Sequence, residues 1–131
     1  MSQVSPEVRA IADAAYGALN AGDLDAFVAL VHDEVEFTSL VAEAEGTTFR
    51  GPDGVRAWWV AVRDSFENVT WDLLELQGSE DRAVTRIHIA GVMSGVAVEQ
   101  TMWQAVRLRE GKLGWWATFR TEEEALDAMR R

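Results

Sequence analysis

The segment that most constrains the fold lies near the N-terminus, where residues 16–25 read YGALNAGDLD. The first half of this segment continues an apolar helical stripe. Gly22 can adopt the left-handed conformation that ends a helix, and Asp23 is a favoured N-cap for the next one. The segment therefore predicts the end of one amphipathic helix, a tight turn and the start of a second helix.

The two helices on either side of this turn can be traced from their apolar spacing. Ser5 and Pro6 mark the start of the first helix, as a hydroxyl N-cap followed by proline at the first helical position. Its apolar stripe is Val8, Ile11, Ala12, Ala15 and Leu19. The second helix carries Leu24, Phe27, Val28, Leu30 and Val31 and is expected to end at residues 32–34. His32 is therefore predicted at a helix C-terminus, where an imidazolium complements the helix dipole.

The rest of the chain predicts one further helix, a run of strands and a closing helix. A first strand is expected at 35–39, a loop at 40–48, and a turn at 49–54 that leads into a third helix. Alternating segments separated by short turns predict four strands at about 69–77, 82–93, 96–109 and 112–120. Thr121 and Glu124 form a capping box for the last helix.

This order of elements predicts an α+β architecture, in which a curved antiparallel sheet packs with helices on one face and leaves a pocket at its open end. At 131 residues, the chain 1–131 is expected to form one domain. Nothing in the sequence reads as a linker or a repeat.

Composition excludes several functions. The net charge of −10 repels phosphate backbones and anionic lipid, so neither nucleic acid nor membrane is an expected partner. The chain has no cysteine and only two histidines, so no metal site and no cofactor are predicted. No segment has the order of a signal peptide or the length of a membrane span, and a cytoplasmic location is expected.

Several short motifs, in order, resemble the NTF2-like superfamily, in its SnoaL-like and ketosteroid-isomerase-like branch. They are Ala21–Asp25, Phe49–Val55, Ser94–Glu99, Arg107–Lys112 and Glu124–Asp127. The resemblance implies a cone of sheet and helices around one cavity, and commonly a homodimer formed through the outer face of the sheet. Because this superfamily hosts isomerases, cyclases, hydrolases and non-catalytic subunits, the resemblance does not imply one reaction.

Ketosteroid isomerase uses an Asp base and an oxyanion hole made of a Tyr and a protonated Asp. By the resemblance, the base position falls at Ser39 and the oxyanion Asp at Gln104. The oxyanion Tyr falls at Ala15, one residue before Tyr16, and one helical step is a turn of about 100°. Serine has no pKa suited to taking a proton from carbon, so this mechanism is not expected here. Thr118 and Arg120 occupy positions comparable to the acid/base of SnoaL-like cyclases, which argues against that chemistry too.

The predicted site is therefore an apolar, aromatic pocket with neutral polar groups and no assigned catalytic residue. Its predicted lining is Tyr16, Phe37, Ser39, Trp59, Ile87, Ile89, Met102, Gln104, Val106, Trp116, Thr118 and Arg120. Trp59 and Trp116, with Trp71, would form flat walls, whereas Trp58 is predicted to be core. Gln104 could bind a carbonyl or hydroxyl, or only pair with another buried polar group. Arg120 could orient a ligand, but pairing with a rim acid, from 43–45 or 122–123, is the favoured interpretation.

The opposite face of the same strands is also apolar. Trp103, Trp115 and Phe119 share it with arginines, which predicts a homodimer interface there. In the strand 82–93, Thr85, Ile87 and Ile89 are predicted to face inward and His88 outward.

Two functions remain open from sequence. One is an enzyme of isomerase, cyclase or hydrolase type that acts on a small apolar, cyclic ligand in the cone. The other is a non-catalytic ligand-binding or protein-interaction dimer, which fits the missing carboxylates better.

Overall fold

The first helix forms where its sequence predicts. In the computed structural model, which describes residues 5–40 and 47–130, α1 spans Pro6–Ala21. The Ser5 side chain accepts a hydrogen bond from the Val8 N–H at 3.2 Å, and Gly22 ends the helix with a φ of +70°. Asp23 caps α2 by accepting from the Ala26 N–H at 3.0 Å. The turn inferred from Asn20–Asp23 is therefore confirmed.

The second helix is shorter than predicted. α2 spans only Leu24–Val28, and strand β1 already begins at Val31 and runs to Thr38. The apolar residues of 24–31 fit helical spacing, but Val31, Val35 and Phe37 also alternate as a strand and are all buried there. The Leu113 N–H donates to the Leu30 carbonyl at 2.8 Å, so the chain pairs with another strand here instead of continuing the helix. The prediction that His32 lies at a helix C-terminus is wrong, because it lies in β1.

A short strand was missed by the sequence analysis. β2 spans Thr48–Arg50, partly inside the predicted loop, and residues 41–46 of that loop lie outside the described residues. β2 pairs antiparallel with β1, with Phe49 opposite Phe37, and their rings stack with centroids 5.2 Å apart. Three residues are too few to show an alternating pattern.

The remaining elements follow the predicted order, and the four strand predictions are confirmed to within two residues at each end. They are α3 (Gly51–Ser65), β3 (Glu67–Ser79), β4 (Arg82–Met93), β5 (Val96–Arg109), β6 (Lys112–Phe119) and α4 (Glu122–Arg130). The strands form one six-stranded sheet in the order β2-β1-β6-β5-β4-β3, with β1 and β6 parallel and the other neighbours antiparallel. Thr121 caps α4 as predicted, since the Glu124 N–H donates to Thr121 Oγ1 at 3.2 Å, while the Glu124 carboxylate accepts from the Thr121 hydroxyl at 2.9 Å.

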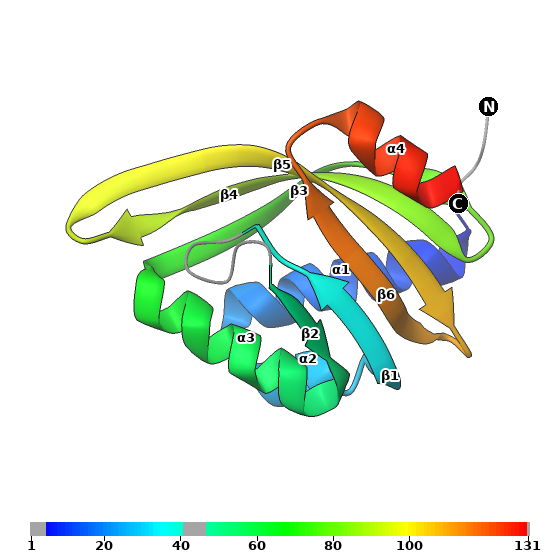
Figure 1. The fold of residues 1–131 in the computed structure, drawn as a ribbon, viewed down its shortest axis with the longest axis horizontal. Helices are drawn as coiled ribbons and strands as arrows, with labels where there is room; N and C mark the ends of the chain where they lie inside the picture. The colour runs from blue at the N-terminus through cyan, green and yellow to red at the C-terminus, as the bar shows by residue number, and fades with distance from the viewer. Residues whose placement is uncertain (1–4, 41–46, 131) are drawn as a thin grey trace.

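Helices cover both faces of the sheet, not one as predicted. α1, α2 and α3 lie along the concave side, while α4 lies across the opposite side over β4, β5 and β6 (Figure 1). Small residues allow this close approach: Ala105 and Ala117 of the sheet are buried together with Ala125 and Ala128 of α4. The main core therefore sits between α1–α3 and the concave face. None of the helices in the described ranges is long and apolar enough to cross a bilayer.

Candidate ligand-binding cavity

A small cavity lies inside the cone, between α1 and the concave face of the sheet. Its volume is about 50 Å³. One wall is the apolar stripe of α1, made of Val8, Ile11, Ala12, Ala15, Tyr16 and Leu19. The facing wall includes Thr85 of β4 and Gln104, Val106 and Leu108 of β5. An engineered apolar cavity that holds benzene measures about 150 Å³, so this one is about a third of that size.

A chain of hydrogen bonds crosses the polar layer of this cavity. Thr85, Gln104 and Thr118 lie directly opposite one another on β4, β5 and β6, because each pair is in register. The Tyr16 hydroxyl reaches this layer from α1 and donates to Gln104 Oε1 at 2.5 Å. Gln104 Nε2 donates to Thr118 Oγ1 at 3.1 Å. Because the Tyr16 proton is used on Gln104, the contact of 2.8 Å between Tyr16 and Thr85 has Thr85 as its donor.

This chain of hydrogen bonds uses only one of the two side-chain N–H groups of Gln104. A glutamine amide carries two N–H groups. Within the described part of the chain, Gln104 donates one of them to Thr118. Among the hydrogen bonds of the described residues, the second has no acceptor. Gln104 thus pairs with other polar groups, which was one of the two alternatives inferred from sequence, and the binding of a carbonyl or hydroxyl stays a prediction.

Tyr16 lies closer to the site than the resemblance to ketosteroid isomerase implied. The expected offset of one helical step does not remove it from the site, since Ala15 and Tyr16 both line the cavity and Tyr16 is only 8% exposed. An apolar helix face is about 100° wide or more, so two successive residues can both lie on it. The longer side chain of Tyr16 brings its hydroxyl to the strands, whereas the Ala15 side chain has no polar group.

Burial keeps the Tyr16 hydroxyl neutral. Desolvation raises the pKa of Tyr16 far above its ordinary value of 10.0, and the hydrogen bond with Thr85 lowers it by a smaller amount. The hydroxyl is therefore a hydrogen-bond donor and no base at physiological pH. Around the cavity, the described residues include no carboxylate, histidine, lysine or arginine. An acid–base pair for proton transfer is accordingly not found among them.

The aromatic walls differ from the predicted set. Trp58, Trp71, Trp116 and Phe27 line the cavity, and Trp116 stacks on Phe37 with centroids 4.1 Å apart. The prediction that Trp58 is core is confirmed, and Trp58 lines the cavity as well, whereas Trp59, which was predicted to line the pocket, does not border this cavity. Trp59 stacks behind Trp71 at 6.1 Å and borders a groove on the surface instead. Successive residues of a helix point about 100° apart, so apolar spacing does not fix which one reaches a cavity.

Ser39, at the position of the isomerase base, is used in packing. It is 3% exposed, and its hydroxyl accepts a hydrogen bond from Trp58 Nε1 at 3.1 Å. Phe37 and Ile87 are fully buried in the core and do not line the cavity.

Three of the predicted lining residues surround a different hollow. Ile89, Met102 and Arg120 border a groove of about 300 Å³ further along the concave face, together with Leu40 and Phe66. Arg120 is exposed, and the acids predicted as its partners in the loop, Glu43 and Glu45, lie outside the described residues. Of the twelve predicted residues, the cavity thus brings together Tyr16, Gln104, Val106 and Trp116, with Thr118 bound to Gln104.

The predicted lining omitted the following cavity residues: Val8, Ile11, Ala12, Ala15, Leu19, Phe27, Trp58, Trp71, Leu76, Ala83, Thr85, Leu108 and Leu113. A signal existed for Thr85, since its strand alternation predicted an inward side chain, and for Trp71, which was named as a wall. The inward prediction for Thr85, Ile87 and Ile89 agrees with their burial.

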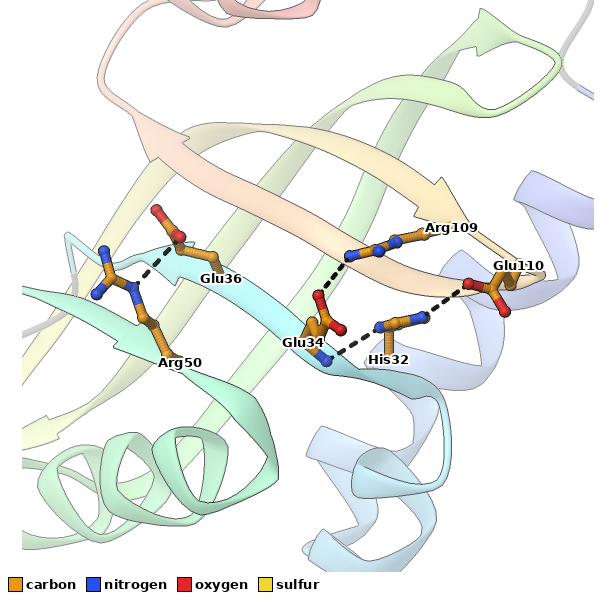
Figure 2. A network of polar contacts seen from close by, with 6 residues as sticks. All are labelled: His32, Glu34, Glu36, Arg50, Arg109 and Glu110. Atoms are coloured by element: carbon orange, nitrogen blue, oxygen red, sulfur yellow. Dashed lines mark hydrogen bonds and ion pairs between the residues drawn. The ribbon is translucent and has the colours of Figure 1, made fainter.

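Both histidines lie away from the cavity, each with its Nε2 beside a glutamate carboxylate. His32 Nε2 lies 3.3 Å from Glu110 Oε1, within a ladder of side chains that also contains Glu34 with Arg109 and Glu36 with Arg50 (Figure 2). His88 Nε2 lies 3.6 Å from Glu99 Oε2. In the described ranges, no group of three or more potential ligands among His, Asp and Glu could hold a metal ion.

Taken together, a curved sheet wrapped around helices, with one neutral cavity inside, defines an NTF2-like cone protein. Residues 12–116 match the model of the SnoaL-like domain. The chain belongs to this family.

Solved structures agree with this assignment. A protein of Catenulispora acidiphila with a ketosteroid isomerase-like fold, in complex with trimethylamine, is 18% identical with a TM-score of 0.75, over 97% of this chain and 95% of that one. An NTF2-like protein of Burkholderia pseudomallei is 16% identical with a TM-score of 0.79, over 97% and 100%. RV0760c of Mycobacterium tuberculosis, in complex with estradiol-17beta-hemisuccinate, is 15% identical with a TM-score of 0.75, over 91% and 97%. At these identities the likeness shows the fold alone. No curated protein matches the sequence.

Proposed function

We propose that this protein binds a small, largely apolar molecule in the cone and holds it by one carbonyl or hydroxyl group, without acid–base catalysis. The observation that carries the proposal is the pairing of Tyr16 with Gln104 inside an otherwise apolar, aromatic cavity. A buried polar layer that keeps a spare donor favours a ligand with a single polar group, because burying that group unpaired would be costly.

The size of the cavity limits which part of a ligand it can hold. At about 50 Å³ it has room for a polar group and a few adjoining atoms. A complete ring enters only if a lining side chain moves. Two proteins of the same fold are solved with small molecules, one with trimethylamine and the other with estradiol-17beta-hemisuccinate, which supports a ligand-binding function.

A catalytic function is the weaker alternative. An isomerase of this fold needs a base near the bound ring, and Ser39 at that position is buried and bound to Trp58. Tyr16 is held neutral by burial, so it can stabilise a bound oxygen but cannot remove a proton from carbon.

The test is a calorimetric titration with phenol and with toluene, which have similar shapes and differ in the hydroxyl. The wild type is expected to prefer phenol, because the hydroxyl pairs with the polar layer. Gln104→Leu is expected to lose this preference. Gln100→Leu, with the same substitution on the same strand outside the cavity, is expected to keep it. The proposal is contradicted if neither compound binds, or if Gln104→Leu keeps the wild-type preference for phenol.

We also infer a homodimer formed through the outer face of the sheet. Beside α4, this face presents Trp103, Trp115 and Phe119 half-buried, with the Arg107 guanidinium 4.8 Å above the Trp115 ring. The buried indole N–H of Trp103 has no hydrogen-bond partner within the described ranges. Sedimentation velocity is expected to give a dimer that Trp103→Ala weakens, and a wild-type monomer at all concentrations would overturn this inference.

A further inference from the structure

A groove on the surface continues the line of the cavity. It lies where the last turns of α1 and α3 meet the first residues of β3, and its volume is about 560 Å³. The cavity is far smaller, at about 50 Å³. The groove is therefore large enough for the part of a ligand that the cavity cannot hold.

The same three elements border both spaces. On α1 the cavity is lined up to Leu19, and the groove is lined from Leu19 to Gly22. On β3 the cavity is lined by Trp71 and the groove by residues 67–69. Leu19 belongs to both linings, and it lies three residues from Tyr16, about 4.5 Å along the helix axis. The groove is therefore next to the end of the cavity and in line with it.

Side chains lie at the boundary of the two spaces. Leu19 lines both of them, and Trp59, which lines the groove, stacks on Trp71, which lines the cavity. The backbone at this point is pinned, because the Asn20 side chain donates to the Trp71 carbonyl and accepts from the Trp71 N–H, both at 2.7 Å. Because Leu19 lines both spaces, a change of its rotamer is the motion expected to join them.

The groove carries a cation beside an aromatic ring. Arg63 is exposed, and its guanidinium lies 5.7 Å from the centre of the Trp59 ring. Among the ion pairs of the described residues, none involves Arg63, although Glu67 lines the same groove. Arg63 also lies near the C-terminal end of α1, since a Cβ added to Gly22 would lie 3.9 Å from its Nη1. It could therefore bind an anionic group or only complement the helix dipole.

We propose that the groove is the second compartment of the binding site, and that the ligand is an elongated, ring-containing molecule with a carboxylate. The carboxylate pairs with Arg63 in the groove, the ring passes Leu19 beside Trp59, and the opposite polar end reaches Tyr16 and Gln104. This inference rests on the proposed function of the cavity and adds the chemical class of its ligand.

The test compares para-hydroxycinnamate with its neutral amide, para-hydroxycinnamide, by titration calorimetry. The two probes share the ring and the hydroxyl and differ only in charge. The wild type is expected to bind the carboxylate about fivefold more tightly, as an exposed ion pair allows. Arg63→Gln is expected to abolish this ratio and Arg63→Lys to restore part of it. The matched control Arg56→Gln, on the same helix but paired with Asp25, is expected to keep it.

The outcomes separate the two proposals. If both probes bind and Gln104→Leu weakens both, but Arg63→Gln leaves their ratio unchanged, the second compartment is overturned and the cavity is not. In that case Arg63 only complements the dipole at the C-terminal end of α1, and Arg63→Gln lowers the melting temperature without changing the ratio. If neither probe binds, or if Gln104→Leu binds both like the wild type, the proposed function fails and this inference fails with it.

Discussion

Two polar networks cross the same sheet on opposite faces, and they differ in charge and in burial. On the concave face, Thr85, Tyr16, Gln104 and Thr118 form a neutral chain of hydrogen bonds inside the core. On the outer face, a ladder of polar contacts pairs His32 with Glu110, Glu34 with Arg109 and Glu36 with Arg50, and all of these side chains except that of His32 are exposed (Figure 2). The ladder is the more conspicuous in sequence, because its residues are charged. The neutral chain is where binding is proposed, since Tyr16, Thr85 and Thr118 are buried and Gln104 is partly buried, so that water competes less there.

The physical reason for the difference is solvent. Exposed ion pairs contribute little, because water screens the charges and side-chain entropy opposes the contact. A buried donor or acceptor that loses its partner costs more, because nothing replaces the bond. The two networks should therefore respond very differently to equivalent substitutions.

The largest expected difference concerns two adjacent tryptophans on opposite faces. Trp116 lines the cavity and stacks on Phe37, whereas Trp115 is half-buried on the outer face under Arg107. Trp116→Ala is expected to lower the free energy of unfolding by about 3–5 kcal/mol. Trp115→Ala should lower it by about 1–2 kcal/mol, from the smaller area it buries. Urea denaturation measures both, and equal losses would break the comparison of the faces.

The next largest loss of stability is expected for Tyr16→Phe. The substitution keeps the ring and removes only the hydroxyl, leaving Gln104 Oε1 without its donor. The expected loss is about 1–3 kcal/mol in the free energy of unfolding. Ser39→Ala offers a comparison, because it too removes one partner of a buried hydrogen bond, the acceptor of Trp58 Nε1, and is expected to cost at least about 1 kcal/mol. A neutral Tyr16→Phe would mean that the chain of hydrogen bonds contributes nothing to stability.

Stability should also fall at alkaline pH because of Tyr16. Its pKa is raised in the folded state, mainly by burial, and is near 10.0 once the chain unfolds. Above that pH the unfolded state releases the proton while the folded state retains it, so unfolding becomes easier by about 1.4 kcal/mol per pH unit. Because Tyr16 is the one tyrosine in the chain, tyrosinate absorbance should appear only with unfolding. Ionisation near pH 10 in the native protein would contradict the burial argument.

The smallest effect is expected for the outer ladder. Glu34→Gln removes its ion pair with Arg109, a contact of 3.1 Å between side chains that are both more than half exposed. The loss should stay below about 1 kcal/mol and shrink further as salt is added. Thermal denaturation at low and high salt measures it. A loss of stability as large as that of Tyr16→Phe would contradict the claim that the exposed network contributes less to stability than the buried one.

Sequence predicted long elements well and short ones poorly. The strands β3 to β6 alternate over eight or more residues, and caps marked both ends of α1. Residues 24–31 failed because their apolar spacing suits a helix and a strand alike, and pairing with β6 decided between them. β2 was too short to show any pattern.

The cavity was predicted in kind but not in all its members. Gln104 and Trp116 follow from strand alternation, because a side chain on a strand can face only one of two sides. Trp58 and Trp59 could not be separated, since both are buried and only tertiary packing decides which one meets the cavity. Residues such as Ile89 and Met102 face the same side as Gln104 but border another groove, which depends on the curvature of the sheet.

The most direct test of the central claim is the NMR signal of the Gln104 side-chain amide during a titration with phenol. If the cone binds ligands through the Tyr16–Gln104 pair, the Gln104 Nε2 resonances should shift and saturate while those of Gln100, on the same strand beyond the cavity, stay in place. Resonances of Gln104 that do not move, or a shift confined to Gln100, would contradict the account.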